Sequence, residues 1–297
     1  MAANEISQLQ IQKFAQDIIH LAQQKKSKLR MCVTEQFDVA NKFVFKVTSA
    51  RAAMTARTNV GVVAGKRTAT AYADQVYNNR VVLPAPYYTA DSFSTYDDAK
   101  RQIESPSAVL TKSFAMQVGR QFDDIIIASF FAAALDSLGN SNSHPAGSQI
   151  GGATTAPSLD LLITAREILA ENEIDPDEEK YFVCTPNYIS ALLADTKVAS
   201  SDFATLKALQ EGKIDRFMGF KFIESNRLTS PGGTPKQIYG AAFTKDAIGL
   251  AVNTEGVVDI GKDPSLSFDT IVQVQIDAGA VRIQDAKCIR VHYLESN

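Results

Sequence analysis

The chain has 297 residues, of which 45% are hydrophobic and 21% are charged, and its net charge is −3 at pH 7. This composition supports an ordinary buried core in one large domain or two closely joined ones. The weakly negative charge excludes a general attraction to nucleic acid or acidic membranes, so any contact with a polyanion must be local.

Cysteine usage and the N-terminal sequence narrow the class further. Cys32, Cys184 and Cys288 are odd in number and far apart, which excludes a disulfide framework and a CxxC metal pair. The start of the chain lacks the features of a signal peptide, and no apolar stretch approaches the roughly 20 residues that cross a bilayer. We therefore expect folding in a reducing cytoplasm, without a membrane partner.

The first region, 1–38, is expected to form an arm. Apolar residues that include Phe14 and Ile18 recur at helical spacing between residues 4 and 29. Their stripe is narrow, so this helix needs another surface to pack on. It either docks on its own domain or reaches a neighbouring subunit.

A basic stretch occupies the second region, 39–80. Between Val39 and Ala73 there is no Asp or Glu, and alternation at 43–47 predicts a short strand that leads into an extended loop. A loop of this length is uncommon unless a partner grips it; a disordered basic loop is the alternative. The candidate inter-subunit contacts are Phe14 and Ile18 in the arm and six cations here: Lys42, Lys46, Arg51, Arg57, Lys66 and Arg67.

The third region, 81–157, contains the strongest local signal. Residues 80–106 are interpreted as a strand that ends at Pro84, followed by an aromatic and Asp-rich connector. From residue 107 to 138, apolar residues recur at steps of four or eight with no proline between them, which predicts one long helix that acts as a strut. Gly139 and Asn140 are expected to end this helix, and a Gly- and Ser-rich surface loop follows.

The fourth and fifth regions, 158–253 and 254–297, differ in period. The fourth alternates helices and strands: a helix capped by Ser158, a strand at 181–185, a helix from Pro186, a short helix at 203–209, and strands at 220–223 and 237–243. The fifth alternates apolar and polar residues, which predicts antiparallel strands with one wet face, a turn or bulge at 278–280, and packing on the long helix. The expected fold class is α+β.

A search for catalytic chemistry finds no recognised motif. There is no HExxH, no GxSxG, no phosphate loop and no histidine pair at ligand spacing. Asp123 and Asp124 diverge by roughly 100° on the predicted helix, so they are interpreted as a solvated face or salt bridges. The acidic cluster at 175–179 lacks the regular spacing of a calcium loop and is interpreted as a solvated turn. We therefore predict no catalytic, cofactor-binding or metal-ligating residues.

The order of these elements resembles that of tailed-bacteriophage major capsid proteins of the Hong Kong 97-type fold. The run RVVLPAPYYTADSFSTYDDAKRQIESPSAVLTKSFAMQVGRQFDDIIIASFFAAA is similar to the segment that leads into the spine helix of podovirus-like coat proteins. EEKYFVCTPNYISALLA and GKIDRFMGFKFIESNRL are similar to elements of their A-domain. The resemblance implies an N-terminal arm at 1–38, an E-loop at 39–80, a P-domain with its spine helix at 81–157, an A-domain at 158–253 and closing P-domain strands at 254–297.

The resemblance also implies a function and a set of partners. The expected role is self-assembly, in the host bacterial cytoplasm, into hexamers and pentamers of an icosahedral head that encloses double-stranded DNA. The expected partners are further copies of the chain, a separate scaffolding protein, a portal protein, a cement protein, and packaged DNA contacted non-specifically. The alternatives are an encapsulin-like nanocompartment shell protein, a phage tail component and a soluble α/β enzyme.

Overall fold

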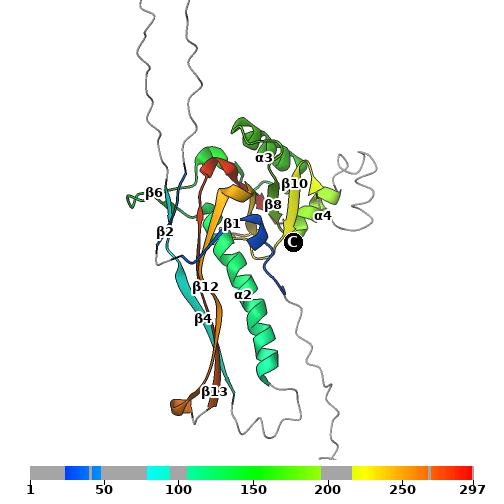
Figure 1. The fold of residues 1–297 in the computed structure, drawn as a ribbon. Coiled ribbons are helices and arrows are strands. Elements are labelled where there is room, and N and C mark those ends of the chain that lie inside the picture. The colour runs from blue at the N-terminus through cyan, green and yellow to red at the C-terminus, as the bar shows by residue number, and fades with distance from the viewer. Residues whose placement is uncertain are drawn as a thin grey trace, which may run out of the picture.

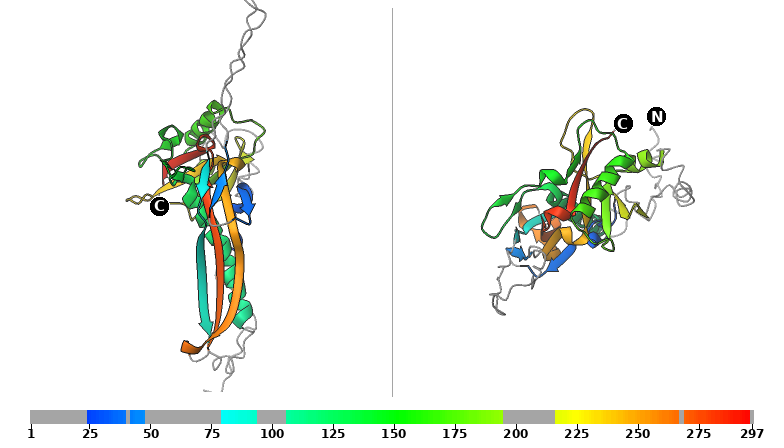
Figure 2. Two further views of the ribbon diagram at one scale, coloured as in Figure 1. Left: turned by 60° about the vertical axis from the view of Figure 1, so that its left-hand side comes forward. Right: turned by 90° about the horizontal axis from the view of Figure 1, so that it is seen from above.

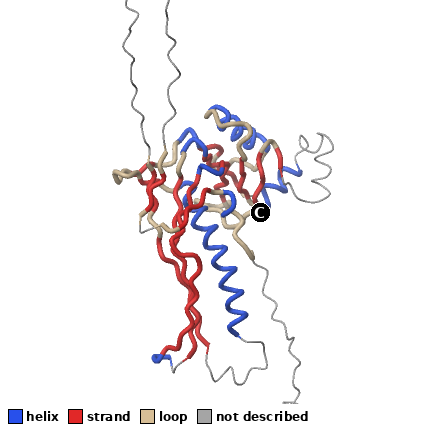
Figure 3. Tube along the Cα trace, viewed as in Figure 1, coloured by secondary structure: helices blue, strands red, loops and turns tan. Residues whose placement is uncertain are grey.

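A compact sheet unit and a long ribbon of strands share the helix α2, which begins at Pro106 and ends at Phe131 (Figure 1). The computed structural model describes residues 24–39, 42–47, 79–93, 106–194, 216–266 and 269–295. These residues form three sheets. Helices and strands are both abundant, as expected for the α+β class (Figure 3).

The sheet unit is built on six strands in the order β7-β14-β11-β8-β10-β9. Two short helices accompany it. The bounds are β7 Gln149–Gly151, α3 Leu159–Glu171, β8 Lys180–Cys184, α4 Pro186–Ala194, β9 Arg216–Phe217, β10 Phe220–Glu224, β11 Gln237–Thr244 and β14 Cys288–Leu294. The predicted helices from Ser158 and Pro186 and the strands at 181–185, 220–223 and 237–243 are confirmed. Ser158 occupies the N-cap position, but its side chain makes no capping hydrogen bond. Their apolar runs fill the main core.

The ribbon consists of three long antiparallel strands, β4 (Ala85–Phe93), β13 (Asp269–Arg282) and β12 (Ile248–Asp263). Helix α2 lies along one of its faces, as both views show (Figures 1 and 2). Val272 and Val274 of β13 are buried against Phe114 of α2, because side chains at alternate strand positions face the helix. The predicted packing of the C-terminal strands on the long helix is confirmed.

A third, small sheet has the order β2-β3-β5-β6. Strand β2 (Phe43–Phe45) pairs with β3 (Arg80–Val82), and the predicted strand at 43–47 is confirmed. Residues 48–78, most of the predicted basic loop, lie outside the described residues, as do the arm residues 1–23 and the predicted helix at 203–209. The pairing nevertheless brings residues 45 and 80 together.

The predicted helix at 107–138 was seven residues too long, since α2 ends at Phe131. The following residues form a hairpin of β5 (Ala134–Leu135) and β6 (Ser141–Asn142). Asp136 accepts the backbone amides of Leu138 and Asn140, at 2.9 and 2.8 Å, and holds the turn. Leu138 is 86% exposed, so its place in the apolar series was accidental.

Two other strand predictions are corrected. The predicted connector after Pro84 is the strand β4, which pairs with β13 along its length. The turn or bulge expected at 278–280 is absent from β13; the irregularity lies in β12, where two register shifts occur between Val252 and Val257. Gly256, at φ +62°, lies within that irregular stretch.

The remaining short elements connect these sheets. Strand β1 (Thr34–Phe37) pairs in parallel with the start of β12. Short 3-10 turns occur at η2 Arg30–Cys32, η3 Ala146–Ser148, η4 Lys245–Ala247, η5 Pro264–Leu266 and η6 Asp285–Lys287.

Candidate assembly surfaces

The structure describes only part of the predicted contact set. Lys42 and Lys46 are exposed on either side of β2, at the base of the hairpin that β2 forms with β3. The other candidates lie outside the described residues: Phe14, Ile18, Arg51, Arg57, Lys66 and Arg67. Contacts between those residues and a neighbouring subunit therefore stay predictions.

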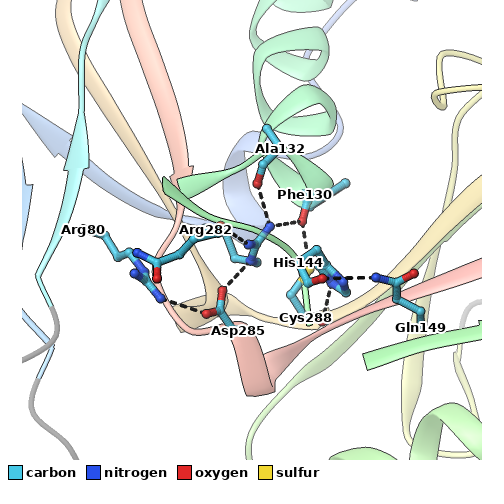
Figure 4. Close-up of polar contacts among 9 residues, drawn as sticks. Arg80, Phe130, Ala132, His144, Gln149, Arg282, Asp285 and Cys288 are labelled. Atoms are coloured by element: carbon cyan, nitrogen blue, oxygen red, sulfur yellow. Dashed lines mark hydrogen bonds and ion pairs between the residues drawn. The ribbon is translucent and has the colours of Figure 1, made fainter. Parts of the chain in front are cut away.

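A buried arginine joins the end of α2 to the ribbon (Figure 4). Arg282 has no exposed side-chain surface, and its Nη1 donates to the carbonyls of Phe130 and Ala132 at 3.0 and 2.9 Å. The predicted alternation of the C-terminal strands puts Arg282, between the apolar Val281 and Ile283, on the wet face, and this prediction was wrong. Its cation instead satisfies carbonyls that have no partner within the helix, at the end where the helix dipole favours positive charge.

Asp285 extends this polar network to the base of the basic loop (Figure 4). Its Oδ1 accepts from Nε of Arg282 at 2.6 Å, and its Oδ2 accepts from Nη2 of Arg80 at 2.8 Å. Arg80 belongs to β3, so one carboxylate links the hairpin base to the end of α2. Sequence reasoning missed this network.

His144 lies next to that network (Figure 4). Its Nε2 is 3.1 Å from the carbonyl oxygen of Cys288, and its Nδ1 is buried without a hydrogen-bond partner among the described residues. Burial lowers the pKa of His144, and the nearby charge of Arg282 lowers it further. The imidazole is therefore suited to staying neutral inside the fold.

Asp123 lies under the segment 24–29, which we call the arm root. Asp123 is only 1% exposed, so its predicted place on a solvated face was wrong. The carboxylate accepts the Oγ of Ser27 at 2.5 Å and the amides of Lys28 and Leu29 at 3.1 Å each. Gln24 donates its side-chain amide to the same group.

Asp124 and the acidic cluster at 175–179 make ordinary contacts. Asp124 pairs with Arg227, which confirms the predicted salt bridge. Glu178 pairs with Lys287 at 2.8 Å, and Glu179 pairs with Arg216 at 2.9 Å.

Within the described part of the chain, no group of three or more His, Cys, Asp or Glu side chains could hold a metal ion. None of the described helices is long and apolar enough to span a membrane.

The ribbon exposes apolar surface and carries a negative charge. Its exposed apolar residues are Tyr87, Tyr88, Val257, Val258 and Ile260. The ribbon segments 85–93, 253–263 and 269–275 contain a single cation, Lys262, and five acids. One of them, Glu255, pairs with Arg30; the other four are Asp91, Asp259, Asp263 and Asp269. Register places Tyr88, Gln275 and Val257 side by side on the face that points away from α2.

The arrangement of a long helix along an extended ribbon beside a sheet unit is shared with solved phage capsid structures. The chain is similar to the capsid of cyanophage P-SCSP1u, with a TM-score of 0.71, 16% identity, and coverage of 99% of this chain and 96% of that chain. It is also similar to the head structure of Helicobacter pylori bacteriophage KHP40, with a TM-score of 0.69, 12% identity, and full coverage of both chains, 100% and 100%. At these identities, the likeness shows the shared fold.

The family follows from the sequence itself. The phage capsid protein family model matches residues 6–295, and the chain belongs to this family. It is a major capsid protein that forms the shell of a phage head together with further copies of itself. No curated protein matches the chain by sequence.

Proposed function

We propose that this capsid protein assembles as hexamers and pentamers of an icosahedral head that encloses double-stranded DNA. The observation that carries the proposal is the ribbon, which α2 covers on one face only, while the other face exposes Tyr88 and Val257. Exposed apolar surface on a long, otherwise ordered element is typical of a protein interface. A single subunit leaves that surface in water, whereas a neighbouring subunit would cover it.

The basic loop of a neighbour is the occupant that we propose for this surface. The stretch 39–73 contains cations and no acid, whereas the ribbon contains acids and one cation. Opposite charges steer association and fix its register. Lys66 and Arg67 would then lie close to Asp259 and Asp263. Lys42, Lys46, Arg51 and Arg57 would make further contacts with neighbouring subunits, and Phe14 and Ile18 of the arm a separate apolar contact.

The division of the chain follows from the same proposal. We assign 1–38 as the arm, 39–80 as the E-loop, 81–157 and 254–297 as the P-domain, and 158–253 as the A-domain. Strand β14, within 254–297, pairs with β11 of the sheet unit, so this last region contributes to both parts of the fold. We further propose assembly in the host cytoplasm with a separate scaffolding protein, a portal protein, a cement protein and non-specific contact with DNA. The role is structural, with no catalytic step.

Charge reversal followed by rescue tests the proposed contact. The double substitution Asp259→Lys and Asp263→Lys should lower the yield of closed shells at least 10-fold in sedimentation and negative-stain microscopy, because the neighbour's loop is then repelled. Adding Lys66→Glu and Arg67→Glu should restore much of the yield. Glu171→Lys, an exposed acid on α3, is the matched control and should assemble normally. Failure of the rescue would contradict the pairing of these two regions.

A further inference from the structure

The arm root lies against two residues of α2, Gly119 and Asp123, which are one helical turn apart. A Cβ atom at Gly119 would lie 3.0 Å from the backbone nitrogen of Ser27 and 3.3 Å from the carbonyl carbon of Lys26. A Cβ at this position would require the backbone of the arm root to move by a few tenths of an ångström, so glycine suits the close approach. Asp123, four residues later on the same face, receives the next residues of that backbone.

Among the described residues, every donor to the Asp123 carboxylate belongs to the arm root. They are one side-chain amide, one hydroxyl and two backbone amides. A buried carboxylate needs such donors, because burial without them is costly. The side chains of Gln24 and Ser27 specify the register of the segment, since a shift by one residue would move both donors away from the carboxylate, whereas every residue offers a backbone amide.

Gly119 and Asp123, together with the contacts that flank them, form the binding site of the arm root, which we call the arm-root seat. Leu29 has no exposed surface and belongs to the main core. The Nζ of Lys28 donates to the carbonyl oxygen of Glu224 at 2.7 Å, at the end of β10. The arm root therefore contacts both the helix and the sheet unit.

We propose that Gly119 and Asp123 fix the position and direction in which the N-terminal arm leaves the body, which makes Asp123 a positioning residue for shell assembly. The proposal rests on the arm's proposed role in contacting a neighbouring subunit. Asp123 itself would not contact the neighbouring subunit. It acts by setting the starting point from which residues such as Phe14 and Ile18 reach one.

Limited proteolysis of the full chain tests the seat independently of assembly. Lys25, Lys26 and Lys28 are trypsin sites within the arm root. Asp123→Asn keeps the size of the side chain but removes its negative charge and replaces one acceptor oxygen by an NH2 group, which then faces either the side-chain amide of Gln24 or the backbone amides of Lys28 and Leu29. Cleavage at the arm root of the unassembled subunit should accelerate at least 10-fold. Asp124→Asn, on the next residue of the same helix, is the matched control and should be cleaved at the unaltered rate; equal rates for both variants would overturn the proposal.

The assembly test separates positioning from general stability. Asp123→Asn should reduce the yield of closed shells at least 10-fold, and the arm variant Phe14→Ser with Ile18→Ser should reduce it as well. Because both changes act through the arm, the combined variant should lose no more than the worse of the two. Multiplied losses would show that Asp123 supports folding alone and would overturn the positioning role.

Two further variants keep these outcomes distinguishable. If Asp123→Asn does not fold, Gly119→Ala and Ser27→Ala replace it, since each disturbs the seat from a different side. The arm variant could assemble normally while Asp123→Asn still exposes the trypsin sites. That result would contradict the proposed contact of the arm with a neighbouring subunit, and it would support the role of Asp123 in holding the arm root. An unchanged trypsin pattern in all three variants, Asp123→Asn, Gly119→Ala and Ser27→Ala, would contradict the proposal that these residues hold the arm root in place.

Discussion

Arg282 and Asp285 form an ion pair at 2.6 Å in which the arginine side chain has no exposed surface. The pair lies at the point where α2, the ribbon and the hairpin base meet, because Arg282 also binds carbonyls of α2 and Asp285 also binds Arg80. A buried cation of this kind is costly unless all its donors are used. Its contacts therefore fix the angle between the helix and the strands that surround it.

Replacing Arg282 should destabilise the unassembled subunit strongly. Arg282→Met removes the guanidinium donor from the carbonyls of Phe130 and Ala132, and among the described residues only the weak thiol donor of Cys288 remains, at Phe130. We expect a loss of about 3 kcal/mol in the free energy of unfolding. Urea denaturation followed by circular dichroism measures it. Arg216→Met, which removes an exposed ion pair with Glu179, is the control and should change stability within experimental error. Similar losses in both variants would contradict a structural role for the buried network.

Two glycines with similar positive φ values should respond differently to alanine. Gly151 and Gly139 have φ values of +76° and +87°, so alanine is strained at both, by about 1–2 kcal/mol. At Gly151 the new Cβ would also lie 2.1 Å from the carbonyl oxygen of His292, whereas at Gly139 it meets nothing within 4 Å. Gly151→Ala should therefore lower the thermal midpoint much more than Gly139→Ala. Equal shifts would show that the β7–β14 pairing tolerates the clash.

His144 should make the subunit sensitive to mild acid. Its pKa is lowered in the folded state by burial first and then by the charges of Arg282 and Arg290. Below about pH 6.5, the ordinary histidine pKa, the unfolded chain therefore binds a proton that the folded chain does not, and stability falls as the pH drops. His144→Gln should flatten this decline between pH 7.5 and 5 in urea titrations.

The matched control for His144 is the less buried His292. Burial and Arg290 also lower its pKa, so His292→Gln should flatten the acid decline in the same direction. We expect the smaller effect there, because more of its ring reaches solvent. A steeper acid decline after His144→Gln would contradict the predicted sign.

The cysteines should be nearly unreactive in the folded subunit. All three are buried, and burial raises the pKa of Cys32 to about 11 and that of Cys288 to about 12. At pH 8 the reactive thiolate is then scarce, so a disulfide reagent should modify the native thiols at least about 100-fold more slowly than the thiols of the unfolded chain. Cys32 should react first. Rapid native labelling of Cys184, whose pKa burial raises further, would contradict the structure.

Local patterns were sufficient where a side chain's surroundings come from its own element. The four-residue steps of apolar side chains predicted the start and the buried stripe of α2, with Phe114, Phe122 and Phe130 all in the core. Alternation predicted β14 and the faces of β13 from Val272 to Ile276 in the same way, whereas the predicted break at 278–280 and the predicted wet face at Arg282 were wrong. The arrangement of these elements in chain order was also sufficient to suggest the capsid family.

Only the tertiary structure decided which polar residues are buried and where elements end. Arg282 binds the carbonyl of Ala132 across 150 residues of sequence, and Asp123 binds the amide of Leu29 across 94. No local period records such partners, so Asp123 was indistinguishable from its solvated neighbour Asp124. In the same way, 85–93 was interpreted as a connector because its pairing partner, β13, lies far along the chain. Side-chain periodicity depends on the backbone of one segment, whereas burial of a charge depends on donors that a distant segment brings.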